Sequence, residues 1–498
     1  MTTTPQMAHA WIGLAVCGAV AACSSNATRQ PARVDVSDMP SAAELGGQRG
    51  AAAAGRVTGV AVAQPGAGAQ GSATPPGSAA LPSVTVQAAS VAIKSTAVTG
   101  HNFDVELQLL FRIAACGSEA ALPVTLTPGD LITVAEHCRA IAKRIAKYRS
   151  SYMAVAQPFL AALTPPDVPT TLVYPFGGGD LLSALVAFPK ATSITTISLE
   201  LAGDPRRITT LHDAALRHSL GALRLQIGGL LSVGSNTSEN LSAQQRNELP
   251  GQVSSFLLGL ATVGATPVAM RYFRIGADGT LQYISDDDVA MLDGAEPGKQ
   301  AEQRPVAAAG AVPKAALATR RKTTWHSPNF AEAFANVEIE FRLAGETTTR
   351  VHRHIGWNLA NDYVVDHPEL LAYLRKLAAP GRIAVLVKGA SYLLWHREFA
   401  TMRTFLLDNL AWMLSDSTGI PPAFANAAHM QQTTYGDYAG AFLPGAEAGW
   451  TRHSDAFRKL WASQPRRRLP FRFGYVDAAK QAHLLITKPA LAVPPVSR

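Results

Sequence analysis

The chain has 498 residues, a formal net charge of +8 and a charged-residue content of 16%. This length fits two domains, or one large domain with disordered extensions. The low charge content excludes a highly charged disordered protein, and the thinly spread basic excess argues against nucleic acid as a partner. After the first two dozen residues no apolar stretch of about 20 residues occurs, which excludes a multi-pass membrane protein.

The amino-terminal segment predicts an exported lipoprotein. Residues 10–22 form a short apolar run that ends in Val20-Ala21-Ala22-Cys23, which resembles the bacterial lipobox. We therefore expect residues 1–22 to be a signal peptide and Cys23 to carry a lipid anchor that includes palmitate. Through this anchor the lipid bilayer would be a partner of the protein. Ser24 favours the outer membrane, facing either the periplasm or the cell surface. The alternative is a cleaved secretory signal, and the lack of Lys or Arg before the apolar run counts against both.

Two segments of low complexity divide the rest of the chain. Residues 23–100 are rich in Ala, Gly, Ser and Pro, so we expect a disordered tether. Residues 294–318 have the same character and predict a linker or a surface insertion. The globular part then consists of a first half (101–293) and a second half (319–489), followed by a tail (490–498).

Two cysteines remain after the predicted anchor, Cys116 and Cys138. An even pair in an exported protein predicts a disulfide, the alternative being two buried thiols. Cys138 lies on a predicted amphipathic helix, whereas the pattern of residues 103–117 fits a strand and a helix equally well. His137 adjoins Cys138, but neighbours on a helix do not face one ligand point, so no metal is expected there.

A glycine turn lies within a predicted βαβ unit, with strands at 171–174 and 194–199 and a helix at 180–188. The turn from the first strand to the helix contains three glycines and an aspartate, namely Gly177, Gly178, Gly179 and Asp180. Glu200 ends the second strand, near the place where an acidic side chain meets a ribose in dinucleotide-binding folds.

The turn has a ligand-binding and a purely structural interpretation. Its sequence matches neither the dinucleotide fingerprint nor a Walker motif, and nicotinamide cofactors are not routinely supplied outside the cytoplasm, so no cofactor is expected. An anion or a sugar hydroxyl would suit the helix amides near Asp180. Alternatively, the glycines only permit a tight turn and Asp180 caps the helix. Asp204 and Arg206 form either a turn with a local ion pair or a second wall of the same site.

The second half repeats the alternation of strands and helices. Residues 337–343 and 350–359 predict a hairpin, Asp366 a helix amino terminus, and residues 383–387 a buried strand that ends at Lys388. His352 and His354 share one face of the hairpin, but a third zinc ligand is not evident.

A helix is predicted over residues 398–414, with Arg403 inside its apolar arc. A core-facing arginine needs a carboxylate or carbonyl partner, for which Asp416 and Asp180 are candidates. A buried ion pair and a site for an anionic group both remain open. Ser391 and Tyr392 follow Lys388, but neither a G-x-S-x-G nor an S-x-x-K order supports a nucleophile there.

The quoted segments resemble a group of exported bacterial lipoproteins. The segments are YPFGGGD, ISLELAGDPR, VKGASYLLWH and DSTGIP, with Tyr435-Gly436-Asp437-Tyr438 after them. The likeness covers most of residues 103–489. It implies no activity, but it suggests that both halves act as one unit.

The sequence as a whole predicts an α/β protein with two βαβ-type halves that form one crevice. Ligands of open α/β sheets sit beyond the carboxyl ends of parallel strands, so three loops should converge there. These loops hold Gly177–Asp180, then Glu200 with Asp204 and Arg206, then Lys388 with Ser391 and Tyr392; Arg403 and Asp416 should lie near the wall.

Two classes of function remain open. The leading hypothesis is a non-catalytic envelope lipoprotein that binds an envelope protein or an anionic small molecule. The alternative is an envelope hydrolase or transferase that acts on a sugar- or phosphate-bearing substrate. Binding is favoured because neither a nucleophile–base spacing nor a metal signature stands out.

Overall fold

The computed structural model describes residues 100–117, 126–232, 249–293, 332–438, 448–474 and 482–490. The predicted signal peptide, Cys23, the linker at 294–318, and nearly all of the tether and the tail lie outside these residues. From Thr99 onward the chain forms one compact unit. Within the described ranges, no helix combines the length and the apolar character needed to cross a bilayer.

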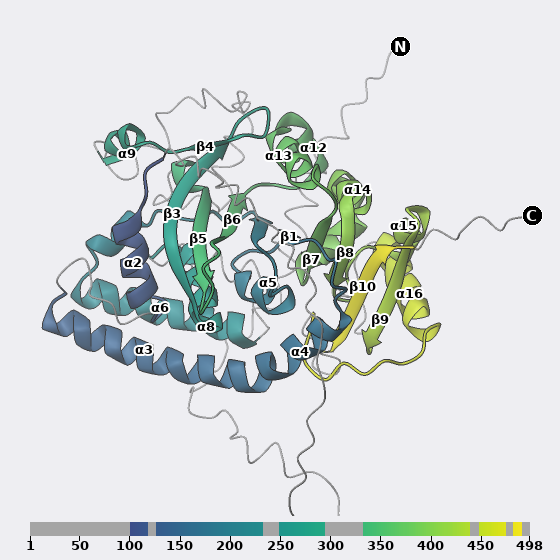
Figure 1. The fold of residues 1–498 in the computed structure, drawn as a ribbon, viewed down its shortest axis with the longest axis horizontal. Helices are drawn as coiled ribbons and strands as arrows, with labels where there is room; N and C mark the ends of the chain where they lie inside the picture. The colour runs from purple at the N-terminus through teal and green to yellow at the C-terminus, as the bar shows by residue number, and fades with distance from the viewer. Residues whose placement is uncertain are drawn as a thin grey trace, which may run out of the picture. The chain divides into compact units, whose positions relative to one another are not determined.

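A ten-stranded mixed sheet forms the centre of the unit, in the order β4-β3-β5-β6-β2-β1-β7-β8-β10-β9 (Figure 1). The strands β6, β2, β1, β7 and β8 run parallel, and antiparallel strands flank them at both edges. The strands are β1 (Thr171–Pro175), β2 (Ser193–Ser198), β3 (Ala265–Ile275), β4 (Leu281–Tyr283), β5 (Asn336–Leu343), β6 (Arg350–Gly356), β7 (Ile383–Val387), β8 (Leu410–Ser415), β9 (Met430–Gly436) and β10 (His483–Pro489). The predicted α/β class is confirmed.

Strands from the two sequence halves are interleaved in blocks in this sheet: β4 and β3, then β5 and β6, then β2 and β1, then the remaining four. β6, from the second half, pairs with β2, and β7, also from the second half, pairs with β1. The two halves therefore share one sheet instead of forming a sheet each, and the boundary at 294–318 does not separate two cores.

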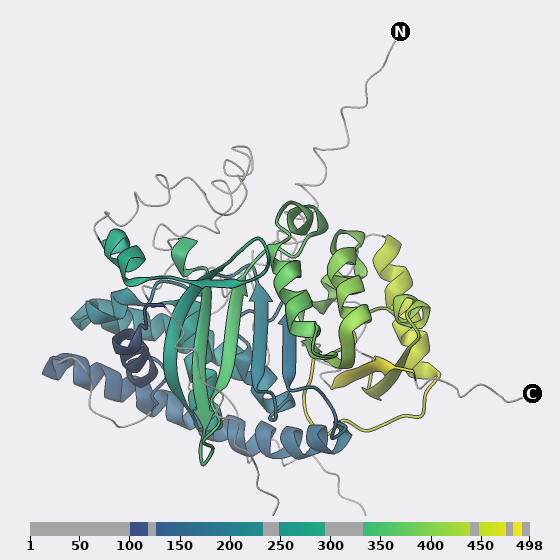
Figure 2. The ribbon, with the colours of Figure 1, turned by 45° about the horizontal axis from the view of Figure 1, so that its top comes forward.

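Helices cover both faces of the sheet, as the turned view in Figure 2 shows. Along β1, Leu172 and Tyr174 point into one hydrophobic cluster and Val173 into the other, because successive side chains of a strand face opposite sides. The first face carries α2 (Asp104–Ile113), α3 (Pro128–Tyr148), α4 (Ala154–Leu163), α5 (Leu181–Ala187), α6 (Asp213–Ser232) and α8 (Gly251–Val263). The second face carries α12 (Asn361–Asp366), α13 (Glu369–Ala378), α14 (Ala400–Asn409) and α15 (Pro422–Ala427). Two further helices are α9 (Asp286–Asp293) and α16 (Ala448–Ala462).

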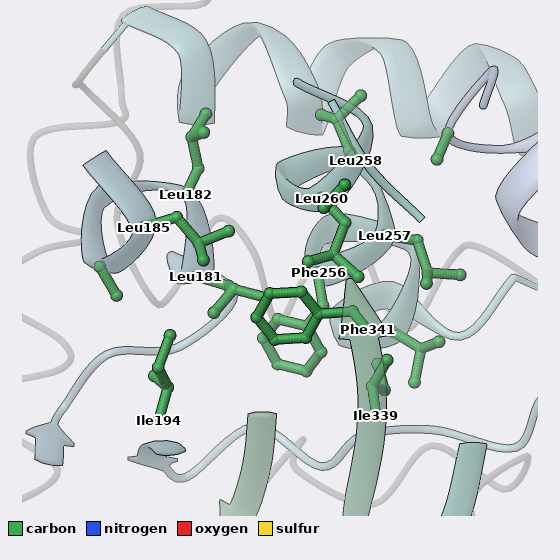
Figure 3. Packing of buried hydrophobic residues seen from close by; sticks show 14 of the residues in the cluster. Leu181, Leu182, Leu185, Ile194, Phe256, Leu257, Leu258, Leu260, Ile339 and Phe341 are labelled. Atoms are coloured by element: carbon green, nitrogen blue, oxygen red, sulfur yellow. The ribbon is translucent and has the colours of Figure 1, made fainter. Parts of the chain in front are cut away.

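The predicted βαβ unit is present, with β1 and β2 parallel and α5 between them. Leucines of α5 pack against α8, and Ile339 and Phe341 of β5 belong to the same hydrophobic cluster (Figure 3). A glycine permits this close approach, because a Cβ atom at Gly259 of α8 would lie 3.3 Å from the backbone nitrogen of Leu182. The packing of α8 fixes where α5, and hence the glycine turn, lies.

Two predicted helix boundaries were wrong. The helix expected over residues 398–414 ends at Asn409, and Leu410–Ser415 forms β8 instead. This apolar run pairs with β7 and β10, and a short apolar run fits a buried strand as well as a buried helix. Asp366 does not begin a helix but ends α12, and α13 begins at Glu369.

The pattern of residues 103–117 fitted a strand and a helix equally well, and the structure forms helix α2 there. Its end lies beside α3, which begins with a capping box between Thr127 and Asp130. The Cα atoms of Cys116 and Cys138 are 5.3 Å apart and their sulfur atoms are bonded, as the sequence predicts. The disulfide ties the end of α2 to the middle of α3.

His137, next to this disulfide, is a fully buried histidine. Its Nε2 donates to the carbonyl of Ala114 at 3.0 Å, and its Nδ1 accepts from Arg224 at 3.4 Å. Burial lowers the pKa of His137 to about 4, and the charges of Arg224 and Arg144 act in the same direction. The ring is therefore neutral in the folded protein at neutral pH.

We expect His137 to make the protein sensitive to acid. An unfolded histidine has a pKa near 6.5, so between pH 6.5 and 4 the unfolded state binds more protons than the folded state. The free energy of unfolding should fall as the pH drops through this window, by on the order of 3 kcal/mol from this residue. In urea unfolding at several pH values, His137→Gln should flatten the pH dependence. Parallel curves for the two proteins would contradict the assignment.

Candidate functional site

The connections of the parallel strands diverge between β1 and β7. From β1 the chain crosses one face of the sheet through α5 to β2, and from β7 it crosses the other face through α14 to β8. β1 and β7 are neighbours, so their carboxyl ends lie together while their connections lead in opposite directions. In open α/β sheets, ligands bind at such a point of divergence.

Asp180 and Lys388 meet at this point. Asp180 caps α5, since its Oδ1 accepts from the backbone nitrogen of Ser183 at 3.1 Å. Its Oδ2 lies 2.8 Å from Nζ of Lys388, which follows β7 directly, and Lys388 also donates to Oγ of Ser183 at 2.6 Å. The side chains of Lys388 and Asp180 are 14% and 18% exposed, so the ion pair is only partly hydrated. The predicted meeting of the Gly177–Asp180 and Lys388 loops is observed.

Tyr174 and Ser183 complete the polar cluster, although the sequence did not single them out. The hydroxyl of Tyr174 donates to Oδ2 of Asp180 at 3.1 Å. Burial, together with the charge of Asp180, raises the pKa of Tyr174 well above its usual range, so the phenol remains a donor. The side chain of an N-cap residue accepts from the backbone nitrogen two or three residues later. Ser183 stands three residues after Asp180, so this spacing could have identified Ser183 from the sequence.

The glycine turn touches two further polar side chains. Gly178 has a φ of +50°, and a Cβ atom there would lie 3.5 Å from Oε1 of the buried Glu200. A side chain at Gly179 would collide with the amide of Gln252 on α8. Glu200 thus lies beside the turn, as predicted, whereas Gln252 was not foreseen.

A buried histidine pair supports the end of β2. Nε2 of His354 donates to the carbonyl of Glu200 at 2.8 Å, so its Nδ1 accepts from Oγ1 of Thr196 at 3.0 Å. The Thr196 oxygen in turn accepts from Nε2 of His352 at 3.0 Å. Burial lowers the pKa of His354 to about 4 and that of His352 well below its usual value, so both rings are neutral.

The two histidines share a face, as their spacing predicts, but they bond to a threonine. In the part of the chain that the structure describes, no three His, Cys, Asp or Glu side chains are grouped to hold a metal ion.

Asp416 fixes the loop that carries Lys388. Its carboxylate is fully buried, and its Oδ2 accepts from the backbone nitrogen of Gly389 at 2.9 Å. Its Oδ1 accepts from the backbone nitrogen of Thr418 at 2.9 Å. Asp416 therefore lies at the site, as predicted, and ties the end of β7 to the end of β8.

Arg403 is buried, but neither candidate carboxylate is its partner. Its Nη1 donates to the carbonyl oxygens of Leu394 and His396, at 2.7 and 2.9 Å. Its guanidinium lies 3.8 Å from the ring centre of Phe424. The expected pairing of Arg403 with Asp416 or Asp180 is therefore wrong, because two carbonyl oxygens and an aromatic face take the place of a carboxylate. Through the carbonyls of Leu394 and His396, Arg403 fixes the backbone of the segment that follows Lys388.

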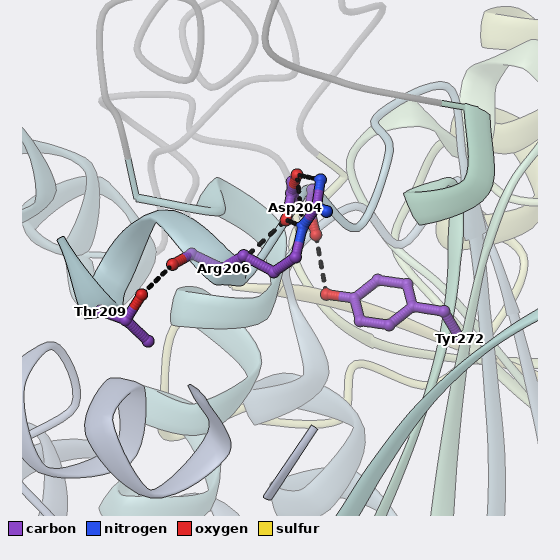
Figure 4. Close-up of polar contacts among 5 residues, drawn as sticks. Asp204, Arg206, Thr209 and Tyr272 are labelled. Atoms are coloured by element: carbon purple, nitrogen blue, oxygen red, sulfur yellow. Dashed lines mark hydrogen bonds and ion pairs between the residues drawn. The ribbon is translucent and has the colours of Figure 1, made fainter. Parts of the chain in front are cut away.

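Asp204 and Arg206 lie away from Lys388 and Asp180. They form a local ion pair of 2.6 Å beside Tyr272 of β3, whose hydroxyl donates to the carbonyl of Gly203 (Figure 4). The guanidinium of Arg206 also lies 4.9 Å from the ring centre of Phe334. In the sheet, β5, β6 and β2 lie between β3, beside which this turn lies, and β1, which leads into the glycine turn. The turn with a local ion pair is the interpretation that the geometry supports.

Ser391 and Tyr392 lie in the short 3-10 segment Ala390–Trp395. Their side chains lie outside what the structure describes, so their proposed place in the site stays a prediction.

The polar cluster of Tyr174, Asp180, Ser183 and Lys388 consists of hydrogen-bond donors and acceptors that fix one another in position. Nζ of Lys388 donates to the carboxylate of Asp180 and to the hydroxyl of Ser183. A comparison of the chain with protein-family models, curated proteins and solved structures finds no match.

Proposed function

We propose that this protein is a lipid-anchored protein of the bacterial envelope whose α/β domain binds a small polar ligand beyond β1 and β7. The Asp180–Lys388 contact is the observation that carries the proposal, because it places charged groups where the connections of the parallel strands diverge. Export and anchoring rest on the lipobox-like segment at Cys23. The Cys116–Cys138 disulfide supports an oxidising compartment.

Binding is favoured over a hydrolase or transferase activity. A nucleophilic serine needs an adjacent base that can take its proton. Ser183 is the hydroxyl that Lys388 contacts, yet Lys388 acts there as a donor and Ser183 is 9% exposed. The cluster therefore suits recognition better than covalent catalysis.

The charges favour a ligand without a net negative charge. Lys388 already donates to Asp180, so an incoming anion would compete with that carboxylate for the ammonium group. A neutral polar molecule can add hydrogen bonds without breaking the ion pair. The anionic ligand suggested by the sequence is thus the weaker candidate.

Replacing Lys388 tests the location of the binding site. Calorimetry of the full chain with glucose, N-acetylglucosamine, choline and phosphate should find binding of at least one neutral probe. Lys388→Met should weaken that binding by about tenfold, because it removes the donor that holds the loops of the site together. The matched control is Lys376→Met, since Lys376 of α13 forms an exposed ion pair with Asp278 and should be dispensable. Equal affinities of the two variants would contradict the location.

Replacing Cys23 tests the membrane anchor. Metabolic labelling with a palmitate analogue should mark the wild-type protein and leave Cys23→Ala unlabelled, because a lipobox cysteine is the attachment point. Label that persists in the variant would show that Cys23 is not the anchor.

A further inference from the structure

Gln252 is a buried amide that lacks hydrogen-bond partners. It lies in the first turn of α8, and its side chain is 0% exposed. Neither its Oε1 nor its Nε2 has a hydrogen-bond partner among the residues that the structure describes. Leaving a buried polar group unpaired costs about 1–3 kcal/mol, so an amide with two unpaired atoms calls for an explanation.

The amide faces the glycine turn of the candidate site. Its Oε1 is so close to Gly179 that any side chain there would collide with it. Gly178, the preceding residue, lies beside the carboxylate of Glu200, and Asp180, the following residue, contacts Lys388. The turn thus has a carboxylate on one side, an amide on the other and the ion pair at its end.

We propose that Gln252 is a recognition residue that binds hydroxyl groups of a neutral, hydroxyl-rich ligand, namely a saccharide. The inference rests on the proposed function, whose ligand class it specifies. A carboxamide pairs with hydroxyls at both atoms, because a hydroxyl donates to Oε1 and another accepts from Nε2. The ligand supplies the partners that the folded chain does not.

The surrounding charges favour hydroxyls over phosphate. The carboxylate of Glu200 lies beside Gly178, where it would repel an anion. Of the three glycines, Gly178 has the most space, because a Cβ atom there would meet no atom closer than Oε1 of Glu200 at 3.5 Å.

A bound water molecule is the competing explanation, and stability distinguishes it. If water satisfies Gln252 as part of the fold, removing the amide loses those hydrogen bonds and lowers the melting temperature. If the amide has no hydrogen-bond partner until a ligand binds, replacing it with an apolar side chain of similar length leaves the ligand-free protein as stable as before, or more stable.

The test compares Gln252→Met with wild type in the full chain. Without sugar, we expect a melting temperature equal to or above that of wild type. In calorimetry with glucose and N-acetylglucosamine, we expect the better-binding sugar to lose about tenfold in affinity. Gln432→Met is the matched control: Gln432 is also buried, but its Nε2 donates to Ile420 and Thr487. This control should lower the melting temperature and leave sugar affinity unchanged.

Four results would overturn the inference. They are a lower melting temperature of Gln252→Met than of wild type, an equal sugar affinity of Gln252→Met and wild type, tighter binding of phosphate than of either sugar, and no binding of either sugar. Lys388→Met separates this inference from the proposed function. If only Lys388→Met loses affinity, the site beyond β1 and β7 stands and the role of Gln252 falls. If only Gln252→Met loses affinity, Gln252 binds the sugar at the glycine turn and the assignment of Lys388 to the binding site falls.

Discussion

The parallel pairing of β1 with β7 is the contact on which the rest of the structure depends. It aligns Leu172 with Ala384 and Val173 with Val385, and so joins strands from the two halves of the sequence. On one side of this contact the chain continues through α5, and on the other through α14, each on its own face of the sheet. Without the pairing, the glycine turn and Lys388 would belong to separate sheets.

The charges at this junction are compensated locally. Partly buried ions are tolerated when a partner of opposite charge and further hydrogen bonds replace the lost water. Asp180 receives hydrogen bonds from Tyr174 and from the backbone of Ser183 in addition to Lys388. Asp416 and Arg403 act differently, because they hold the loop after β7 through backbone groups. The Asp180–Lys388 ion pair is therefore held by its neighbours, and the carboxylate of Glu200 lies beside the same turn.

Local spacing made part of this arrangement predictable. The βαβ unit, the strand at 383–387 and the helix that carries Cys138 follow from patterns within short windows. The rule for the carboxyl ends of parallel strands then brings Asp180 and Lys388 together. The apolar run at 410–414 was ambiguous, because a buried strand and a buried helix have the same composition.

The parts that could not be predicted depend on tertiary contacts. The apolar neighbours of Arg403 indicate that it is buried, but not that carbonyls bind it. The chain after β2 turns toward β3, which no local pattern reveals, so Asp204 and Arg206 lie away from Lys388. Gln252 meets Gly179 only because α5 packs on α8.

A double-mutant cycle between Asp180 and Lys388 tests the central claim most directly. The free energies of unfolding of wild type, Asp180→Asn, Lys388→Met and the double variant would be measured by urea titration. A partly buried, hydrogen-bonded ion pair should give a coupling energy of about 1–3 kcal/mol. Effects that add to within about 0.3 kcal/mol would show that the two loops do not meet, and would contradict the site beyond β1 and β7.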